Sequence, residues 1–317
     1  MKVVALAGGV GGAKLADGLY RTLTADSLTV IVNCGDDFAP FGLRVCPDLD
    51  TVCYTLAGLA NPQTGWGRQG ETWVAYEEIR RLGGPAWFHL GDQDLATHLE
   101  RTRRLQSGET LSRVTRDFCQ AWGITARVLP MTDDWMPTWV DTVDNGWLPF
   151  QEYFVKLACE PKVKGFEFRG AQEARPAPGV IESIRDADCV VICPSNPWVS
   201  IGPILSVPGV MEALKKCPVR VVISPIVGGK AIKGPAAKMF TELGIQPSCL
   251  AVAQHYQDWC THFIMDREDS HFSEKIEALG MSVTVTDTMM YDSEDRIRLA
   301  RETLEVCSRS IKKDKSG

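Results

Sequence analysis

The sequence predicts an α/β fold, a Rossmann-like and doubly wound, mainly parallel sheet with a smaller inserted α+β subregion. Short apolar runs alternate with amphipathic stretches along most of the 317-residue chain, a rhythm typical of strands joined by crossover helices. A glycine-rich segment directly follows the first apolar run. An Asn145-Gly146 pair between two alternating runs indicates a hairpin, which belongs to an antiparallel subregion.

The elements of the core follow in order along the chain. Strands are expected at the apolar runs 2–7, 28–33, 87–90, 126–130, 189–193, 220–226 and 282–286. Helices are expected near 13–23, 48–59, 71–81, 92–104, 111–122 and 292–310, where apolar residues recur at helical spacing. The end, 312–317, is expected to be solvated.

The middle of the chain has a different pattern. Strands are expected at 139–143, 147–150 and 163–169, around a helix at 151–159. We therefore predict a Rossmann-like core formed by 1–135 and 180–317, which carries the nucleotide and metal loops, and an inserted subregion at 136–179.

Composition narrows the class of protein. Asp and Glu number 40 against 34 Lys and Arg, a net charge of −6, which disfavours a nucleic-acid or anionic-membrane partner. We find no apolar stretch of the ~20 residues that span a bilayer and no secretory signal. The 11 cysteines include no C-x-x-C pair and the five histidines no paired spacing, so a zinc site is not expected. A cytoplasmic enzyme with small-molecule substrates is predicted.

The glycine-rich segment at 8–14 is the first candidate site. Gly9, Gly11 and Gly12 precede Lys14 between a strand and a helix, where backbone amides and a helix N-terminus can hold phosphate. The spacing meets neither the dinucleotide fingerprint nor the P-loop pattern. A tight turn without a ligand is the alternative; four glycines in five positions favour phosphate or substrate contact.

Acidic residues follow the second strand on the same predicted sheet edge. Asn33 precedes Asp36 and Asp37, and Asp48 and Asp50 open the next helix. Oxygen ligands of this kind suit Mg²⁺, which takes one or two carboxylates together with phosphate oxygens and water. Asp48 has an alternative role as a helix N-cap. Asp50 lies two residues further on and favours metal binding or catalysis.

Three further loops are expected at the same edge, because ligands bind beyond the carboxyl ends of parallel strands. Each has an ordinary structural alternative as a turn or a capped helix start. Their candidate substrate-binding residues are Asp92 and Gln93, then Ser195, Asn196 and Pro197 between two strands, and Gly228 in a second glycine-rich segment.

Together these motifs resemble the 2-phospho-L-lactate transferase family of deazaflavin coenzyme F-420 biosynthesis. The resemblance rests on segments 8–14, 33–37, 47–51, 90–98, 194–203 and 224–234. The stretch 65–73 is similar to the actinobacterial phosphoenolpyruvate transferase branch. The resemblance to this family implies a Rossmann-like core, a magnesium requirement and a homodimer.

The resemblance also implies a reaction. A GDP-activated phospho-acid is the donor, and the terminal ribityl hydroxyl of the deazaflavin precursor Fo attacks the phosphorus nearer the acid, releasing GMP. By position, the first glycine segment and Ser195-Asn196-Pro197 would hold the guanosine diphosphate, and Asp50 would face the Fo hydroxyl or the metal. Gln93 departs from the family, which commonly has Arg there, and Gln cannot replace that charge.

Our hypothesis is that Asp48 and Asp50, with Asp36, place Mg²⁺ on the diphosphate, and that Asp50 also takes or orients the proton of the hydroxyl. Two alternatives come from other classes. An NAD(P)-dependent oxidoreductase would need no magnesium, and a non-catalytic guanine-nucleotide-binding regulator would form no product from Fo. Phospholactate, phosphoenolpyruvate and phosphoglycerate all stay open as the acid of the donor.

Overall fold

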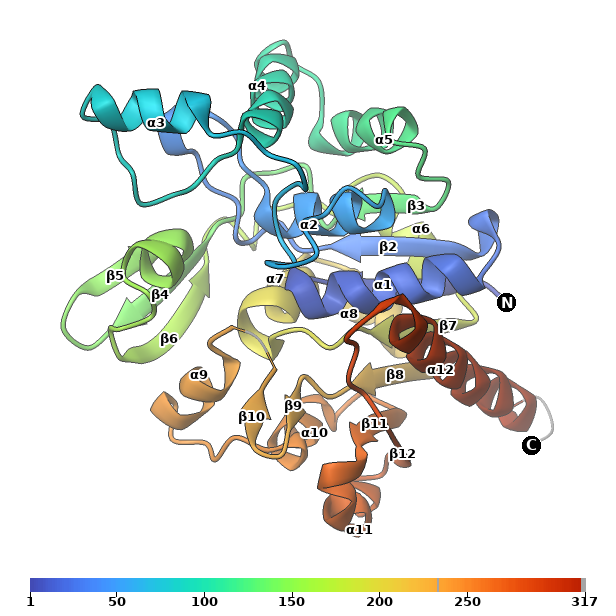
Figure 1. Cartoon of the computed structure of the whole chain (residues 1–317). Coiled ribbons are helices and arrows are strands. Elements are labelled where there is room, and N and C mark those ends of the chain that lie inside the picture. The colour runs from blue at the N-terminus through green and yellow to red at the C-terminus, as the bar shows by residue number, and fades with distance from the viewer. Residues whose placement is uncertain (233, 315–317) are drawn as a thin grey trace.

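A seven-stranded parallel sheet forms the centre of the computed structural model, which describes residues 1–232 and 234–314. Its order is β12-β11-β8-β7-β1-β2-β3 (Figure 1). Most of these strands are almost entirely apolar because helices cover both faces of the sheet. The strands are β1 (Val3–Ala7), β2 (Leu28–Val32), β3 (Arg127–Pro130), β7 (Cys189–Ile192), β8 (Val219–Ile223), β11 (His262–Asp266) and β12 (Ser282–Thr286).

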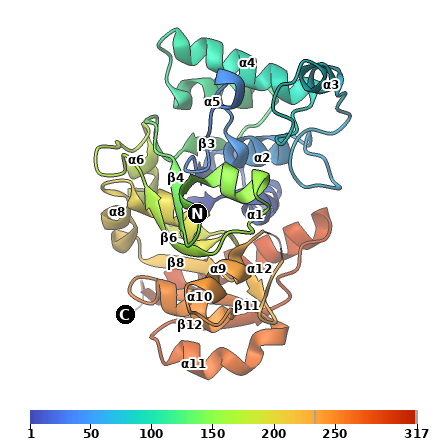
Figure 2. The same ribbon diagram turned by 90° about the vertical axis from the view of Figure 1, so that its left-hand side faces the viewer.

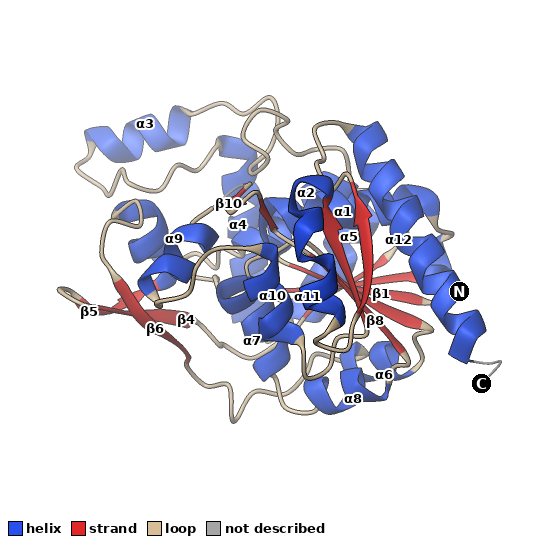
Figure 3. Ribbon diagram, turned by 90° about the horizontal axis from the view of Figure 1, so that it is seen from below, coloured by secondary structure: helices blue, strands red, loops and turns tan. Residues whose placement is uncertain are grey.

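Helices lie on both sides of this sheet. Helix α1 (Gly9–Thr22) packs between α2 (Pro47–Leu56) and α12 (Ser293–Asp314). On the other face α6 (Val180–Arg185) packs on α8 (Val210–Lys216), as Figure 3 shows. This arrangement confirms the predicted doubly wound α/β class. The other helices are α3 (Val74–Arg81), α4 (Asp92–Gln106), α5 (Leu111–Ala121), α7 (Gly202–Ser206), α9 (Ala236–Glu242), α10 (Cys249–Tyr256) and α11 (Ser273–Glu277).

A small antiparallel sheet stands beside the core (Figure 2). Its order is β5-β4-β6, from β4 (Thr138–Thr142), β5 (Gly146–Pro149) and β6 (Val163–Phe168). Gly146 has φ +65 at the turn between β4 and β5, a conformation that favours glycine. Buried side chains of this sheet form a second apolar cluster with Val199 and Met239 of the core. A short antiparallel pair, β9 (Ile226–Val227) and β10 (Lys230–Ala231), completes the sheets.

Several predicted elements differ from the structure. The strand expected at 87–90 is wrong, because Trp87 and Phe88 pack with Phe38 as an aromatic cluster and join no sheet. Strand β11 was not predicted. The helix expected at 151–159 is a π-helical turn, Glu152–Lys156. Of the expected solvated end, 312–314 continue α12 and 315–317 lie outside the described residues.

Strand order fixes where a ligand binds. From β1 the chain passes to β2 and β3 on one side, whereas β7 lies on the other side of β1 and leads to β8, β11 and β12. The carboxyl ends of β1 and β7 therefore border a switch point, where ligands bind in open parallel sheets. Within the described part of the chain, no helix is both long and apolar enough to cross a bilayer.

Candidate active site

A cleft of about 740 Å³ opens at the switch point, beyond the carboxyl ends of β1, β2 and β7. Its walls come from the start of α1, from α2, from the Pro194 loop and from the small sheet's π-helical turn. Of the sequence-predicted residues, those lining the cleft are Gly9, Gly11, Lys14, Asp36, Asp48, Asp50, Ser195 and Asn196.

The glycines lie in the first turn of a helix. Helix α1 begins at Gly9, four residues earlier than predicted. The backbone amides of its first turn have no partner within the helix and lie at the cleft, which Gly9 and Gly11 line. The hydroxyl of Ser195 donates to the carbonyl of Gly8 at 2.9 Å and joins the ends of β1 and β7. A Cβ at Gly11 would lie 2.3 Å from the carbonyl oxygen of Pro194. Glycine is therefore required for this close approach.

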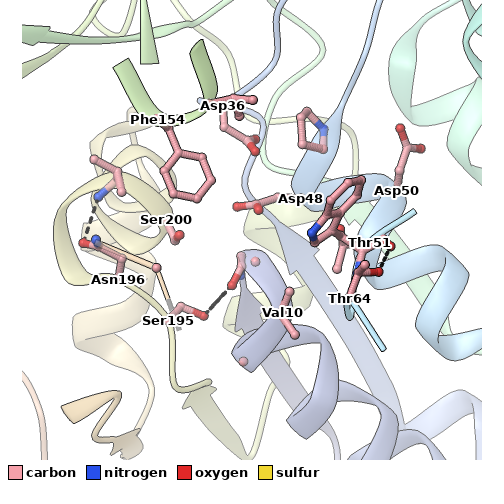
Figure 4. A pocket seen from close by; sticks show the side chains of 18 of the residues that line it. Val10, Asp36, Asp48, Asp50, Thr51, Thr64, Phe154, Ser195, Asn196 and Ser200 are labelled. Atoms are coloured by element: carbon pink, nitrogen blue, oxygen red, sulfur yellow. Dashed lines mark hydrogen bonds between the residues drawn. The ribbon is translucent and has the colours of Figure 1, made fainter. Parts of the chain in front are cut away.

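Asp36 and Asp48 form a buried pair of carboxylates above the start of α1 (Figure 4). Burial and the charge of Asp48 raise the pKa of Asp36 well above its usual range. Burial raises the pKa of Asp48 to about 6, although hydrogen bonds from Asn33 and from the Gly9 amide oppose the shift. Among the described residues, Oδ1 of Asp36 is buried without a hydrogen-bond partner. Two adjacent buried carboxylates with an unpartnered oxygen fit a hard divalent cation.

Asp48 is not the N-cap that was considered as its alternative role. Helix α2 begins at Pro47, and Cys46 occupies the cap position. The side chain of Asp48 instead accepts from Nδ2 of Asn33 at 2.9 Å. Asn33 thus orients Asp48 without lining the cleft itself.

Asp50 points away from the other two acids (Figure 4) and is held by Arg101 of α4. Nη1 of Arg101 donates to Oδ2 of Asp50 at 3.0 Å, and Nη2 donates to Oδ1. Arg101 is 2% exposed, so this bidentate pair is shielded from water. Asp50 still lines the cleft.

Asp94 and His98 lie on the same face of α4 as Arg101. Nε2 of His98 stands 3.3 Å from Oδ1 of Asp94, and Nδ1 stands 3.7 Å from Oδ2 of Asp50. The hydroxyl of Tyr54 donates to Oδ1 of Asp94 at 2.7 Å. Burial opposes ionisation of Asp94, but its interactions with His98 and the hydrogen bond from Tyr54 outweigh this effect and lower the pKa of the carboxyl.

Aromatic side chains form two walls of the cleft. Trp66, Trp87 and Phe88 line one side. Phe150 and Phe154 line another, with ring centroids 5.4 Å apart and planes 11° from parallel. Walls of this kind can stack on a planar ring system.

A family model described as 2-phospho-L-lactate transferase CofD matches residues 3–306. The chain belongs to the CofD family. It is a phospho-acid transferase of coenzyme F-420 biosynthesis, as the resemblance predicted.

Curated relatives match over nearly the full length. A phosphoenolpyruvate transferase of Streptomyces griseus is 44% identical over 96% of this chain and 98% of the relative. One of Mycobacterium bovis is 41% identical over 95% of this chain and 97% of the relative. The crystal structure of a UPF0052 family member from Bacillus halodurans superposes with a TM-score of 0.64 at 17% identity, covering 96% of this chain and 98% of that one. That likeness supports the fold.

Three other residues predicted in this CofD chain do not line the cleft. A Cβ at Gly12 would lie 2.7 Å from Oγ of Ser195, so Gly12 permits the packing of that loop. Pro197 is buried at the start of the turn after Asn196. Gly228, with φ +55, forms the turn between β9 and β10, and its amide donates to Asp269.

Asp92 and Gln93 form hydrogen bonds with the segment 70–75. Asp92 accepts from the amides of Val74 and Ala75 at the start of α3. The amide of Gln93 donates to Glu71 at 2.8 Å, and its side chain donates to the carbonyl of Gly70 at 2.9 Å. Neither residue lines the cleft. Gln93 therefore ties the 70–73 segment to α4 in this member of the family.

Sequence patterns did not identify the residues around Asp50, which are Tyr54, Asp94, His98 and Arg101. The last three are spaced four and three residues apart. That spacing places them on one face of a helix. Their charge and polarity on the inner face of α4 were the available signal.

Proposed function

We propose that the chain transfers a phospho-acid from its GDP-activated diphosphate to the terminal ribityl hydroxyl of Fo and releases GMP. The relatives named phosphoenolpyruvate transferase favour a phosphoenolpyruvyl donor. In the reaction the hydroxyl oxygen bonds to the phosphorus nearer the acid, and the bond from that phosphorus to the bridging oxygen breaks. The observation that carries the proposal is the Asp36–Asp48 pair beside the N-terminus of α1.

Charge supports a bound cation. Four carboxylates, Asp36, Asp48, Asp50 and Asp94, line the cleft, whereas Lys14 is the one lysine or arginine among its described lining residues. A diphosphate brings further negative charge into this site. Asp36 and Asp48 would hold Mg²⁺, which when bound neutralises the diphosphate.

The chain's own groups bind and orient both substrates. The amides at the start of α1 and the ammonium of Lys14 favour the phosphates. The aromatic walls suit the deazaflavin ring. Asp50 accepts a hydrogen bond from the attacking hydroxyl and takes its proton as the new phosphoester bond forms, so positioning supplies a large part of the rate.

The test is to incubate the purified protein with Fo, Mg²⁺ and each of the three GDP-linked acids in turn. We expect GMP and a heavier deazaflavin, formed fastest from the phosphoenolpyruvyl donor. Guanine-nucleotide binding without product from any donor would support the regulator and overturn the transfer reaction. NADPH binding without a magnesium requirement would support the oxidoreductase.

Assembly and compartment are further proposals. We propose a homodimer in the cytoplasm, from the family resemblance and from the composition. Size-exclusion chromatography with light scattering tests the dimer, because a monomeric mass at working concentration would contradict it.

A further inference from the structure

Asp50, Asp94 and His98 form a cluster with the spacing of a metal centre. One ligand atom from each residue lies within 4.8 Å of the others. Ligands at about 2.1 Å from one ion lie about 3 Å apart when they are neighbours in its coordination shell. The contacts of His98 with Asp94 at 3.3 Å and with Asp50 at 3.7 Å come close to that spacing.

Arg101 brings a positive charge to this cluster. Its guanidinium takes both oxygens of Asp50, and Nη1 also lies 3.2 Å from Nδ1 of His98. The same Nη1 donates to the carbonyl of Arg44 at 3.2 Å, and the guanidinium carbon stands 5.9 Å from the centre of the Phe118 ring. An arginine held from several sides is a cation of fixed place and direction.

The guanidinium of Arg101 occupies one of the two ring nitrogens of His98. Because Nη1 of Arg101 carries only donors, Nδ1 of His98 accepts from it. Nε2 of His98 lies 3.3 Å from Oδ1 of Asp94 but has no hydrogen-bond partner among the described residues. Tyr54 satisfies the same oxygen of Asp94. Without the guanidinium, Asp50 and Asp94 would leave two negative charges beside a free imidazole nitrogen, a combination that binds divalent transition metals.

We propose that Arg101 takes the place of a metal ion among Asp50, Asp94 and His98, and that its chelation of Asp50 positions that carboxylate at the cleft. Divalent ions are thereby confined to Asp36 and Asp48. Asp50, which the sequence analysis also considered as a metal ligand, then acts on the substrate hydroxyl instead. The positioning part rests on the proposed function; the metal-binding part does not.

Metal binding tests the first part without any substrate. Equilibrium dialysis of the full wild-type chain against Mn²⁺ alone should give about one ion per chain. Arg101→Met, which keeps an unbranched apolar side chain but removes the guanidinium and its charge, should bind about two, and should also bind Co²⁺ with the absorption of a nitrogen-ligated ion. The added ion should disappear in Arg101→Met/His98→Ala. Arg103→Met is the matched control, since this exposed arginine of α4 pairs with Glu100.

Two results would overturn the metal-binding part. One is a wild-type chain that already binds a further ion which His98→Ala removes. The other is a folded Arg101→Met that binds no more metal than wild type. The first of these results does not depend on Arg101→Met, so the proposal stays testable if that variant does not fold.

Kinetics test the positioning part. Arg101→Lys keeps a positive charge but cannot chelate both oxygens of Asp50. We expect kcat to fall about 100-fold with KM for Fo nearly unchanged, because a misplaced catalytic group has an effect of this size. Unchanged kcat in folded Arg101→Lys would overturn this part. If wild type forms no product from any donor, the proposed function has failed, while the dialysis still reports on Arg101.

Discussion

Ser195 and Gly8 join the two halves of the central sheet where they diverge. The Ser195 hydroxyl donates to the carbonyl of Gly8 at 2.9 Å, and the Gly8 amide approaches the same hydroxyl at 3.3 Å. This contact brings the loop after β7 against the start of α1. The phosphate-binding amides and the acidic pair thus share one cleft.

Gly11→Ala should disrupt that junction. Its Cβ would meet the carbonyl oxygen of Pro194 at 2.3 Å, and because that oxygen belongs to the backbone, relieving the contact requires the backbone to shift. We expect a loss of about 1–3 kcal/mol in the free energy of unfolding and a raised KM for the GDP-linked donor. Urea unfolding and initial rates measure both. Gly165→Ala is the control, because a Cβ there meets nothing within 4 Å; equal effects of the two variants would contradict the close approach.

The acidic pair predicts a pH dependence of the metal-free protein. Burial raises the pKa of Asp48 from 3.8 to about 6, so the fold favours the protonated carboxyl. The protonated Asp48 carboxyl contributes stability to the folded protein. This contribution is fully present below the pKa of Asp48 in the unfolded chain and is lost as pH rises through about 6. In EDTA, Asp48→Asn should therefore stabilise the protein by about 2–3 kcal/mol near pH 8 and hardly at all near pH 4.

Urea unfolding at both pH values measures this effect. The exposed Asp26→Asn is the control, and an equal gain at the two pH values would show that titration of Asp48 is not its source. Mg²⁺ affinity of wild type should weaken as pH falls through about 6, since protons compete for the same carboxylates.

Asp50→Asn should abolish transfer, because an amide cannot take the proton of the attacking hydroxyl. It also leaves the buried Arg101 without its carboxylate, a change that costs about 3–5 kcal/mol of stability in comparable pairs. Turnover must therefore be measured below the variant's own melting temperature, found by circular dichroism. Near-normal kcat in the folded variant would remove Asp50 from the mechanism.

Trp66→Ala should weaken the acceptor rather than the donor. Trp66 lines the cleft and is 49% exposed, so its loss removes stacking surface with little effect on the core. We expect KM for Fo to rise about tenfold with kcat retained, as for loss of one stacking partner. Trp147, which is 44% exposed on the small sheet and lies outside the cleft, is the control, and Trp147→Ala should leave KM for Fo unchanged. A rise in KM for the donor alone would contradict this assignment of the wall.

The sequence predicted the parts of the fold that depend on local pattern. Buried strands followed by glycines or acids marked the binding edge, because parallel strands end there together. The strand at 87–90 was predicted wrongly because a short aromatic run such as Trp87 and Phe88 fits a strand or a packed loop equally well. Strand β11 was missed because its start at His262 and its end at Asp266 interrupt the apolar run.

The site was predictable where residues lie close in sequence, and less so where helices bring them together. Asp36 and Asp48 follow one strand, so their proximity could be anticipated. The pairing of Asp50 with Arg101 joins residues 51 positions apart. Such a contact depends on where α4 lies relative to α2, which single-sequence patterns do not specify.

An oxygen label on the acceptor shows whether the ribityl hydroxyl is the nucleophile that attacks phosphorus. Fo carrying ¹⁸O in its terminal ribityl hydroxyl is incubated with the protein, Mg²⁺ and the GDP-linked phosphoenolpyruvyl donor. The masses of both products are then measured by mass spectrometry. Attack by that hydroxyl on the phosphorus nearer the acid predicts that the deazaflavin product keeps the label and that GMP carries none. Labelled GMP, or a deazaflavin product that has lost its ¹⁸O, would show that this hydroxyl does not attack the phosphorus nearer the acid.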